Sequence, residues 1–271
     1  MILKTSKMKK FKIENKKIWV AGHTGMVGSS VLRKIKERNV KILLTERKQL
    51  DLTNQQSVMD WVKKNSPEII IICAAKVGGI YYNSSHPADF IYTNLAIQTN
   101  IIRAAYNNKV EKLIFLGSSC IYPKKIENEI KETDLLTGVL EETNQWYAIA
   151  KIAGVKMCQA FRKQYGCDYI SVMPCNIFGP GDNYDEKNSH VIPALIRKIY
   201  NAKLKKTNEI EIWGSGKNLR EMLFVDDLSD GIIFCLENYS DLEPINIGSN
   251  NEYSINDFAH KIAKVIDWPI K

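Results

Sequence analysis

The sequence has no long uninterrupted apolar run. The longest one, residues 69–75, is far shorter than the roughly 20 residues that span a bilayer, so we predict no transmembrane helix. Residues 1–16 are basic, but they contain neither an apolar core nor a small-residue cleavage site, which argues against a secretory signal. We therefore interpret them as a basic, solvated N-terminal extension and expect a cytoplasmic protein.

Paired cysteine motifs are missing too. None of the six cysteines forms a C-x-x-C pair, so neither a disulfide framework nor a metal site is indicated. The sequence also lacks internal repeats and low-complexity segments, which excludes a solenoid and a disordered chain. The lysines that contribute to the net charge of +8 are scattered along the sequence, without the interleaved aromatic residues that would form a stacking platform. We expect no nucleic-acid partner, whereas a ligand with several phosphates would suit this charge.

Residues 17–177 alternate short apolar segments with segments of helical periodicity. The apolar segments are rich in Ile, Val and Leu on both faces, which is typical of buried strands in a parallel sheet. Such alternation predicts right-handed crossovers and a Rossmann-type doubly wound sheet of the α/β class. The predicted strands are residues 18–22, 41–45, 68–75, 112–117 and 169–174, and the predicted helices are residues 26–38, 55–65, 89–108 and 147–165.

Residues 178–271 have a different character, because a turn-rich stretch (GPGDNYDEKN) opens them and no linker sets them apart. We expect a smaller substrate-binding lobe, interleaved with the main sheet, beside a dinucleotide-binding domain of residues 17–177. The elements predicted here are helix 190–202, strand 209–213, a helix from Asp226, strand 244–247 and helix 255–266.

A glycine-rich loop follows the first predicted strand. It has the pattern G-x-x-G-x-x-G and precedes a helix, whose N-terminus would offer free N–H groups to phosphates. The first glycine permits a tight turn, the second a close approach to a pyrophosphate, and the third close packing of helix on strand. This context predicts a dinucleotide site rather than a mere packing turn. The loop consists of Gly22, His23, Thr24, Gly25, Met26, Val27 and Gly28.

The end of the second predicted strand bears on the choice of cofactor. A carboxylate there favours the ribose 2′-OH of NAD, and an arginine favours the 2′-phosphate of NADP. The sequence places Arg47 and Lys48 directly after Glu46. The two cations make NADP(H) our prediction, while Glu46 leaves NAD open.

Tyr147 and Lys151 lie four residues apart, on one face of a predicted helix. A lysine cation favours the phenolate and would lower the pKa of Tyr147, so that the tyrosine exchanges a proton with a carbonyl or hydroxyl group. Ser118 follows the fourth predicted strand, at the sheet edge where ligands bind in such folds. Although a Tyr-x-x-x-Lys pair is often a plain surface pair, this position predicts a catalytic one.

Together these motifs resemble those of the extended short-chain dehydrogenases/reductases. Longer stretches are similar, more specifically, to the family of GDP-L-fucose synthases. The resemblance runs from the glycine loop to the last predicted helix. The stretches that carry it are AAKVGGI (residues 74–80), PADFIYTN (87–94), LGSSCIYP (116–123), YAIAKIAG (147–154), NSHVIPALIRK (188–198) and WGSG (213–216) with Arg220.

The resemblance implies an NADPH-dependent 3,5-epimerisation and 4-reduction of GDP-4-keto-6-deoxy-D-mannose, carried out by a homodimer. Cys120 and His190 match the acid/base pair of the epimerisation, while Tyr147, Ser118 and Lys151 would serve the reduction. Further residues would line the cofactor site: Leu116, Gly117, Ser119, Pro174, Cys175, Asn176, Ile177 and His190. Lys198, Trp213 and Arg220 would contact the GDP-sugar.

Three departures from the family pattern keep alternatives open. Thr24 stands where some members carry an arginine, and Lys198 stands where an arginine is common. The chain also ends just after the last predicted helix, so the lobe is expected to be incomplete at its C-terminus relative to the family. The alternatives are another nucleotide-sugar epimerase or 4-keto reductase, and a catalytically impaired NADP-binding protein.

Overall fold

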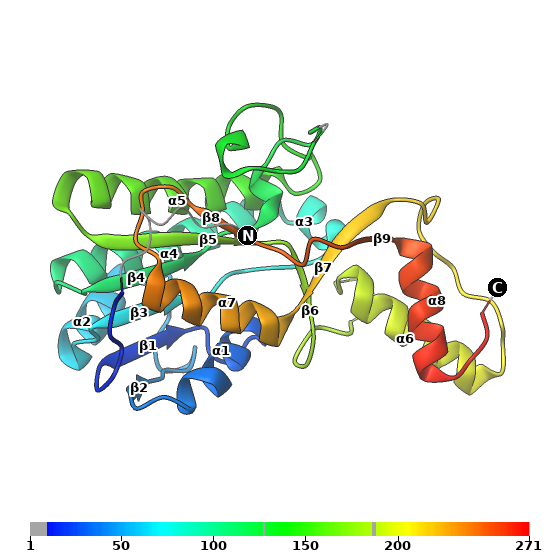
Figure 1. Ribbon diagram of the computed structural model, residues 1–271, viewed down its shortest axis with the longest axis horizontal. Coiled ribbons are helices and arrows are strands. Elements are labelled where there is room, and N and C mark those ends of the chain that lie inside the picture. Colours follow the sequence, from blue (N-terminus) through cyan, green and yellow to red (C-terminus); the bar gives the residue numbers. More distant parts are fainter. Residues whose placement is uncertain (1–9, 127, 186–187, 271) are drawn as a thin grey trace.

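The computed structural model describes residues 10–126, 128–185 and 188–270, so most of the predicted N-terminal extension lies outside the described residues. The chain forms a six-stranded parallel sheet with helices on both faces, and a smaller lobe to one side of it (Figure 1). The predicted doubly wound parallel sheet is confirmed. Its strands are β1 (Lys17–Ala21), β2 (Lys41–Leu43), β3 (Ile69–Ile72), β4 (Lys112–Leu116), β5 (Asp168–Pro174) and β8 (Ile245–Ile247).

The sheet has the strand order β2-β1-β3-β4-β5-β8. From β1 the chain moves first to β2 on one side and then to β3 on the other, which creates a topological switch point at the carboxyl end of β1. Ligands of open α/β sheets bind at such points. The helices on the two faces are α1 (Met26–Lys36), α2 (Gln55–Asn65), α4 (Pro87–Asn107), α5 (Gln145–Tyr165) and α7 (Val225–Asn238).

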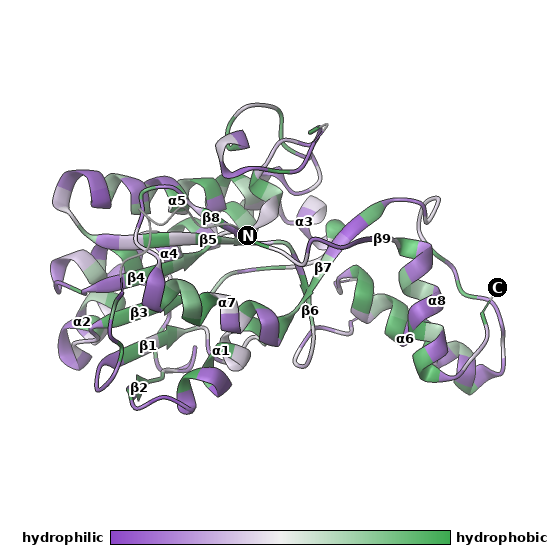
Figure 2. Cartoon of the chain, viewed as in Figure 1, coloured by the Kyte–Doolittle hydropathy of each residue, from purple (hydrophilic) through white to green (hydrophobic). Residues whose placement is uncertain are grey.

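Two hydrophobic cores lie on opposite faces of the sheet, because side chains alternate along each strand. In β3, Ile70 and Ile72 pack in the core beneath α2, α4 and α5, whereas Ile69 and Ile71 pack in the core beneath α1 and α7. All four isoleucines are fully buried. Figure 2 shows the central strands as hydrophobic and the outer helix surfaces as hydrophilic. This explains why the strand sequences are apolar on both faces.

The lobe is built on a second, three-stranded sheet of order β6-β7-β9, with β6 (Asn176–Phe178), β7 (Leu219–Phe224) and β9 (Glu252–Ser254). Helix α6 (Val191–Lys205) packs against α8 (Ile255–Ile266) beside this sheet. Three short helices complete the described chain: α3 (Ile80–Ser85) and the 3-10 turns η2 (Ser119–Ile121) and η3 (Glu132–Asp134).

The predicted strand 209–213 is wrong. These residues are irregular, although Ile210 and Ile212 are less exposed than their neighbours as an alternating pattern requires. The Glu211 carbonyl oxygen accepts a hydrogen bond from Lys198 Nζ. The strand lies further along, at β7, where Arg220 and Glu221 obscure the apolar pattern. β6, β9 and α3 were not predicted from the sequence either.

All six cysteines are free thiols. Within the described residues, no helix is both long and apolar enough to cross a membrane. Nor do three or more His, Cys, Asp or Glu side chains gather anywhere in this part of the chain as metal ligands would.

Candidate active site

The glycine loop lies at the switch point of the sheet. Gly22 has φ +86°, and a Cβ there would lie 2.6 Å from Ala74 Cα. A Cβ on Gly28 would collide with the Gly22 carbonyl oxygen, so α1 packs close to the strand only because position 28 is glycine. Gly25 is different, since its nearest neighbour would be 3.6 Å away in ordinary contact. The first and third glycines therefore shape the loop, and the second keeps its outer side open.

The N-terminus of α1 suits a phosphate group. Gly25 is the N-cap, no side chain caps the first N–H groups, and the first turn holds no acidic residue. Free N–H groups and the positive end of the helix dipole therefore face this loop. Gly181, from the turn that enters the lobe, lies next to the same helix end, because a Cβ there would be 3.6 Å from Met26 Cα. The residues present thus fit a dinucleotide, and the lobe adjoins the helix end that would hold its pyrophosphate.

The cluster after β2 is exposed, and its charges are partly paired. Glu46 forms an ion pair of 3.0 Å with Lys48. The acidic side chain that could have favoured NAD is thus engaged with a neighbour, whereas Arg47 is exposed beyond the end of the strand. This arrangement favours a 2′-phosphate over a free 2′-OH group.

The structure brings Ser118, Cys120, Tyr147 and Lys151 together at the carboxyl end of β4. Lys151 is 3% exposed. Its Nζ donates a 2.8 Å hydrogen bond to the Leu116 carbonyl oxygen and lies 5.7 Å from the centre of the Tyr147 ring. The Ser118 hydroxyl accepts a 3.4 Å bond from the Cys120 N–H, which starts η2. Leu116 and Gly117 are buried beneath this group, and Ser119 is half-buried.

The protonation of this group differs from the sequence-based expectation in one respect. Burial raises the pKa of Tyr147, the neighbouring Cys120 raises it further, and a hydrogen bond with Ser118 opposes both. The expected lowering by Lys151 is not found, because the ammonium group lies over the ring face and bonds to Leu116. Burial lowers the pKa of Lys151 to about 8 and raises the pKa of the Cys120 thiol to about 11. Near neutral pH, Tyr147 and Cys120 therefore both carry protons.

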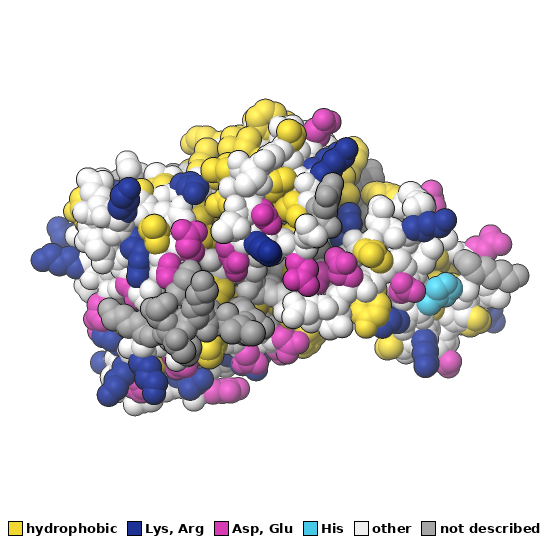
Figure 3. Space-filling view, turned by 45° about the horizontal axis from the view of Figure 1, so that its top comes forward, with side chains coloured by type: hydrophobic (Ala, Val, Ile, Leu, Met, Phe, Trp, Pro, Cys, Tyr) yellow, Lys and Arg dark blue, Asp and Glu magenta, His cyan; other side chains and the backbone are white. Residues whose placement is uncertain are grey.

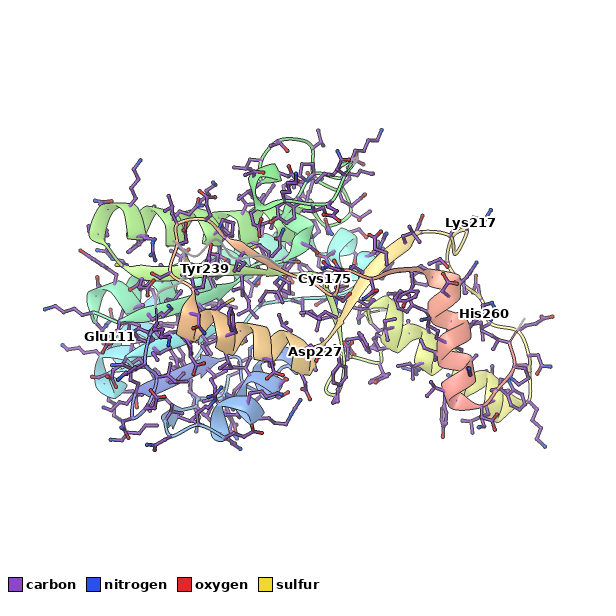
Figure 4. All side chains as sticks on the ribbon, viewed as in Figure 1. Glu111, Cys175, Lys217, Asp227, Tyr239 and His260 are labelled. Carbon is purple, nitrogen blue, oxygen red and sulfur yellow. The ribbon has the colours of Figure 1, made fainter. Side chains whose placement is uncertain are left out.

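Residues 174–177 connect the two sheets. Pro174 ends β5, Asn176 starts β6, and Cys175 between them donates its N–H to the Ile247 carbonyl oxygen at 3.0 Å. Figure 4 shows Cys175 at this junction. Asn176 and Ile177 pair with β7. The predicted cofactor residues 174–177 thus lie where the main sheet passes into the lobe.

His190 is the N-cap of α6, and its side chain is 46% exposed. The loop before it touches the segment after β3: Gly79 donates its N–H to the Asn188 carbonyl oxygen at 3.2 Å, and a Cβ on Gly79 would lie 2.6 Å from the Ser189 carbonyl oxygen. The structure thus holds the start of α6 against the AAKVGGI segment. No direct contact joins His190 to Cys120 among the described residues.

Two of the three predicted substrate residues lie together. Lys198 Nζ is 5.2 Å from the centre of the Trp213 ring, and 67% of Trp213 is exposed. Arg220 is separate: it lies in β7 opposite Tyr253 of β9, and it bonds the carbonyl oxygen of its neighbour Leu219. Both places belong to the lobe.

Sequence reasoning missed residues that support this site. Asn94, 2% exposed, bonds both the N–H and the carbonyl oxygen of Lys76 at 2.9 Å and so anchors the segment after β3. Phe90 packs its ring edge-on against Tyr147, with the centroids 6.3 Å apart. Asp182 lies beside His190. The only signal for Asp182 was its place in the turn-rich stretch.

Comparisons with known proteins identify the family of the chain. The model of the NAD dependent epimerase/dehydratase family matches residues 18–248. A GDP-L-fucose synthase from Sinorhizobium fredii (strain NBRC 101917 / NGR234) is 51% identical over 96% of this chain and 83% of its own length. A GDP-L-fucose synthase from Escherichia coli (strain K12) is 44% identical over 94% of this chain and 83% of its own length.

A solved structure supports the same assignment. A GDP-L-fucose synthetase from Naegleria fowleri bound to NADP has a TM-score of 0.86 and 28% identity, covering 100% of this chain and 85% of that chain. The resemblance drawn from the sequence motifs is confirmed. The chain therefore belongs to the NAD dependent epimerase/dehydratase family, that is, to the extended short-chain dehydrogenases/reductases, and within it to the family of GDP-L-fucose synthases.

Proposed function

We propose that the protein epimerises GDP-4-keto-6-deoxy-D-mannose at C3 and C5 and reduces it at C4 with NADPH, which gives GDP-L-fucose. One observation carries the proposal: Ser118, Cys120 and Lys151 surround Tyr147 at the carboxyl end of β4, at the same edge of the parallel sheet as the glycine loop. A simple 4-keto reductase needs the serine, the tyrosine and the lysine but has no use for an additional thiol. Relatives named GDP-L-fucose synthase support the choice of substrate.

The reduction depends on Tyr147 as a proton donor. When bound, NADPH supplies the hydride for C4. Tyr147, protonated because burial raises its pKa, gives its proton to the C4 oxygen, and Ser118 donates a hydrogen bond to that oxygen. Lys151, bonded to the Leu116 carbonyl oxygen beside the Tyr147 ring, would hold the nicotinamide ribose rather than lower the pKa of Tyr147.

The epimerisation uses the acidity of carbons next to the C4 ketone. A base removes the proton at C3 or C5, and the electron pair of that C–H bond moves into an enolate with its charge on the C4 oxygen. An acid then returns a proton to the same carbon from the opposite face. We assign the acid and the base of this step to Cys120 and His190 together, and Cys120 is protonated near neutral pH because burial raises the pKa of its thiol to about 11.

The cofactor would be held by residues from several elements. The glycine loop and the α1 N-terminus suit the pyrophosphate, Arg47 the 2′-phosphate, and Lys151 with residues 174–177 the nicotinamide half. The NADP bound to the Naegleria fowleri protein supports the preference for NADP(H).

The lobe would hold the GDP-sugar. Lys198 and Arg220 supply cations for diphosphate oxygens, and the exposed Trp213 ring offers a flat surface for a base or a sugar. We accordingly divide the chain into a cofactor domain of residues 17–177 and a substrate lobe, interleaved with the main sheet, of residues 178–271.

The test is to incubate the purified chain with GDP-4-keto-6-deoxy-D-mannose and NADPH, follow NADPH oxidation by absorbance, and identify the sugar by NMR. We expect GDP-L-fucose. Tyr147→Phe is the control, because it removes the proton donor but keeps the ring that packs on Phe90.

Two results would contradict the proposal. If NADPH is oxidised and the configuration at C3 and C5 is retained, the protein is a 4-keto reductase without epimerase activity. If NADPH binds and none is consumed, the protein is a cofactor-binding protein that does not act on this sugar.

We further propose a homodimer formed through α4 and α5, which pack side by side in one subunit. Tyr92 on α4 and Trp146 on α5 are large and 69% and 41% exposed. Figure 3 shows apolar side chains gathered at the upper edge of the molecule, on the side where α5 lies in Figure 1. Light scattering should give twice the chain mass, and Tyr92→Lys should lower it. A single-chain mass at high concentration would refute the dimer.

We also propose that the protein works in the cytoplasm. All six cysteines are unpaired thiols, which suits a reducing compartment. Cell fractionation with a tagged chain tests this, and recovery outside the cytoplasmic fraction would contradict it.

A further inference from the structure

Asp182 is a buried carboxylate beside the imidazole of His190. Its side chain is 6% exposed, although it stands in a surface turn. The Oδ1 atom lies 3.9 Å from His190 Nδ1 and accepts a 2.8 Å hydrogen bond from the Asn183 N–H. The Oδ2 atom is buried and has no hydrogen-bond partner within the described part of the chain. A carboxylate with so few donors is costly to bury unless a cation forms next to it.

The backbone holds the two residues in place from separate elements. The Asp182 N–H bonds to the Gly179 carbonyl oxygen at 3.2 Å, and Gly181 (φ +86°) rests against the first residue of α1. His190 begins α6, where its carbonyl oxygen accepts the Ala194 N–H at 3.0 Å. The fold therefore places the backbones of the two residues close together.

We propose that Asp182 is a positioning residue for His190. Its carboxylate accepts the Nδ1–H of the imidazole, so the ring nitrogen that exchanges a proton with the sugar is Nε2. The separation of 3.9 Å exceeds a hydrogen bond, and rotation of the half-exposed imidazole ring closes it. This inference rests on the proposed function, in which His190 exchanges a proton with C3 or C5.

The carboxylate also acts during the proton transfer. Whenever Nε2 carries the exchanged proton, His190 is an imidazolium, and the adjacent Asp182 carboxylate compensates its charge. The same arrangement orients the histidine of serine hydrolases, where replacing the aspartate by asparagine favours the wrong tautomer.

The tautomer of His190 is a direct test and needs no activity. Correlation of ring carbon-bound protons with both ring nitrogens by NMR distinguishes Nδ1–H from Nε2–H, and the chain has only four histidines. His190→Gln identifies the signal, recorded at alkaline pH where imidazoles are neutral. We expect Nδ1–H in the unaltered chain and a shift to Nε2–H in both Asp182→Asn and Asp182→Ala.

Two variants and one control keep the test decisive. Asp182→Asn preserves the shape of the side chain and an acceptor for the Asn183 N–H, so the turn should persist. Asp227→Asn removes an exposed carboxylate at the start of α7 (Figure 4) and should leave the tautomer unchanged. A dominant Nε2–H form in the unaltered chain, or the same tautomer in all variants, would overturn the proposal.

A second measurement links the pair to the chemistry. Deuterium exchange at C3 and C5 of GDP-4-keto-6-deoxy-D-mannose, followed in D2O with NADP+, should slow by roughly 10- to 100-fold in Asp182→Ala. An unchanged exchange rate would count against the positioning role. If the tautomer shifts as expected but the unaltered chain exchanges neither carbon, the pairing of Asp182 with His190 stands and the proposed substrate fails.

Discussion

The ammonium group of Lys151 donates its hydrogen bond to the carbonyl oxygen of Leu116, the last residue of β4, at 2.8 Å. A side chain from the first half of α5 is thereby bonded to the strand that precedes Ser118. This bond sets how Tyr147, one turn earlier on α5, lies relative to the end of the sheet. The relationship makes Lys151 both a catalytic candidate and a structural one.

The buried lysine should leave a signature in stability. Burial lowers the pKa of Lys151 from 10.5 to about 8 in the folded chain. Between these values only the unfolded chain keeps the proton, so this lysine makes the free energy of unfolding rise with pH across that window. In Lys151→Met this contribution is absent. The free energy of unfolding of the unaltered chain should therefore rise by up to about 3 kcal/mol relative to that of the variant across this pH window.

Urea unfolding of the cofactor-free protein at a series of pH values measures this difference. Lys156→Met, an exposed lysine on the same helix, is the control and should follow the unaltered chain. Parallel stability curves for the unaltered chain and Lys151→Met would show that burial does not depress the pKa of this lysine.

The glycine loop offers a matched pair of substitutions. Gly28→Ala would drive its methyl group into the Gly22 carbonyl oxygen, so we expect a lower melting temperature and a loss of NADPH binding of at least about tenfold. Gly25→Ala meets only ordinary contacts and should keep the melting temperature. It should still weaken NADPH binding, because the methyl group occupies the side that faces the pyrophosphate. Thermal melts and cofactor titrations separate the two effects, and equal behaviour of both variants would contradict this prediction.

Arg47 should decide between the two nicotinamide cofactors. We expect Arg47→Ala to weaken NADPH binding by about tenfold and to leave NADH binding nearly unchanged, because only NADPH carries the 2′-phosphate. Lys48→Ala should have a smaller effect, since Lys48 is paired with Glu46. Fluorescence titrations with both cofactors test this, and an equal loss for NADPH and NADH would exclude Arg47 as the 2′-phosphate ligand.

Cys120 should react slowly with alkylating agents at neutral pH. Burial raises the pKa of its thiol to about 11, so the reactive thiolate is scarce until the pH approaches that value. The rate of iodoacetamide labelling of the peptide that contains Cys120, followed by mass spectrometry, should climb steadily towards pH 11. A labelling rate that levels off near neutral pH would indicate a thiolate at rest and would contradict the raised pKa of Cys120.

Local patterns in the sequence predicted the cofactor half of the fold well. Residues 69–72 are isoleucine throughout, because both faces of β3 are covered. The spacing of the glycines indicated the close packing of Gly28 on Gly22. The four-residue spacing of Tyr147 and Lys151 likewise predicted a shared helix face, because both residues lie in α5.

The lobe was harder to predict because its strands depend on distant partners. The first two residues of β7 are exposed, and the strand forms because its backbone bonds to β6 and β9, far away in the sequence. Residues 209–213 also alternate in apolar character, but they pair with no strand among the described residues. Asp182 and His190 are eight residues apart across an irregular turn, so no helical or strand period could have paired them.

The position of β8 bears on how the protein is made. β8 pairs with β5 and closes that edge of the main sheet, yet it begins at Ile245, 71 residues after β5 ends at Pro174. At ribosomal speeds these residues take about 4–14 s to synthesise. The glycine loop and Tyr147 therefore leave the ribosome well before the sheet that holds them is complete. During this interval β5 is an unpaired edge strand. The nascent chain must therefore avoid pairing of β5 with strands of other chains that are synthesised on the same messenger RNA.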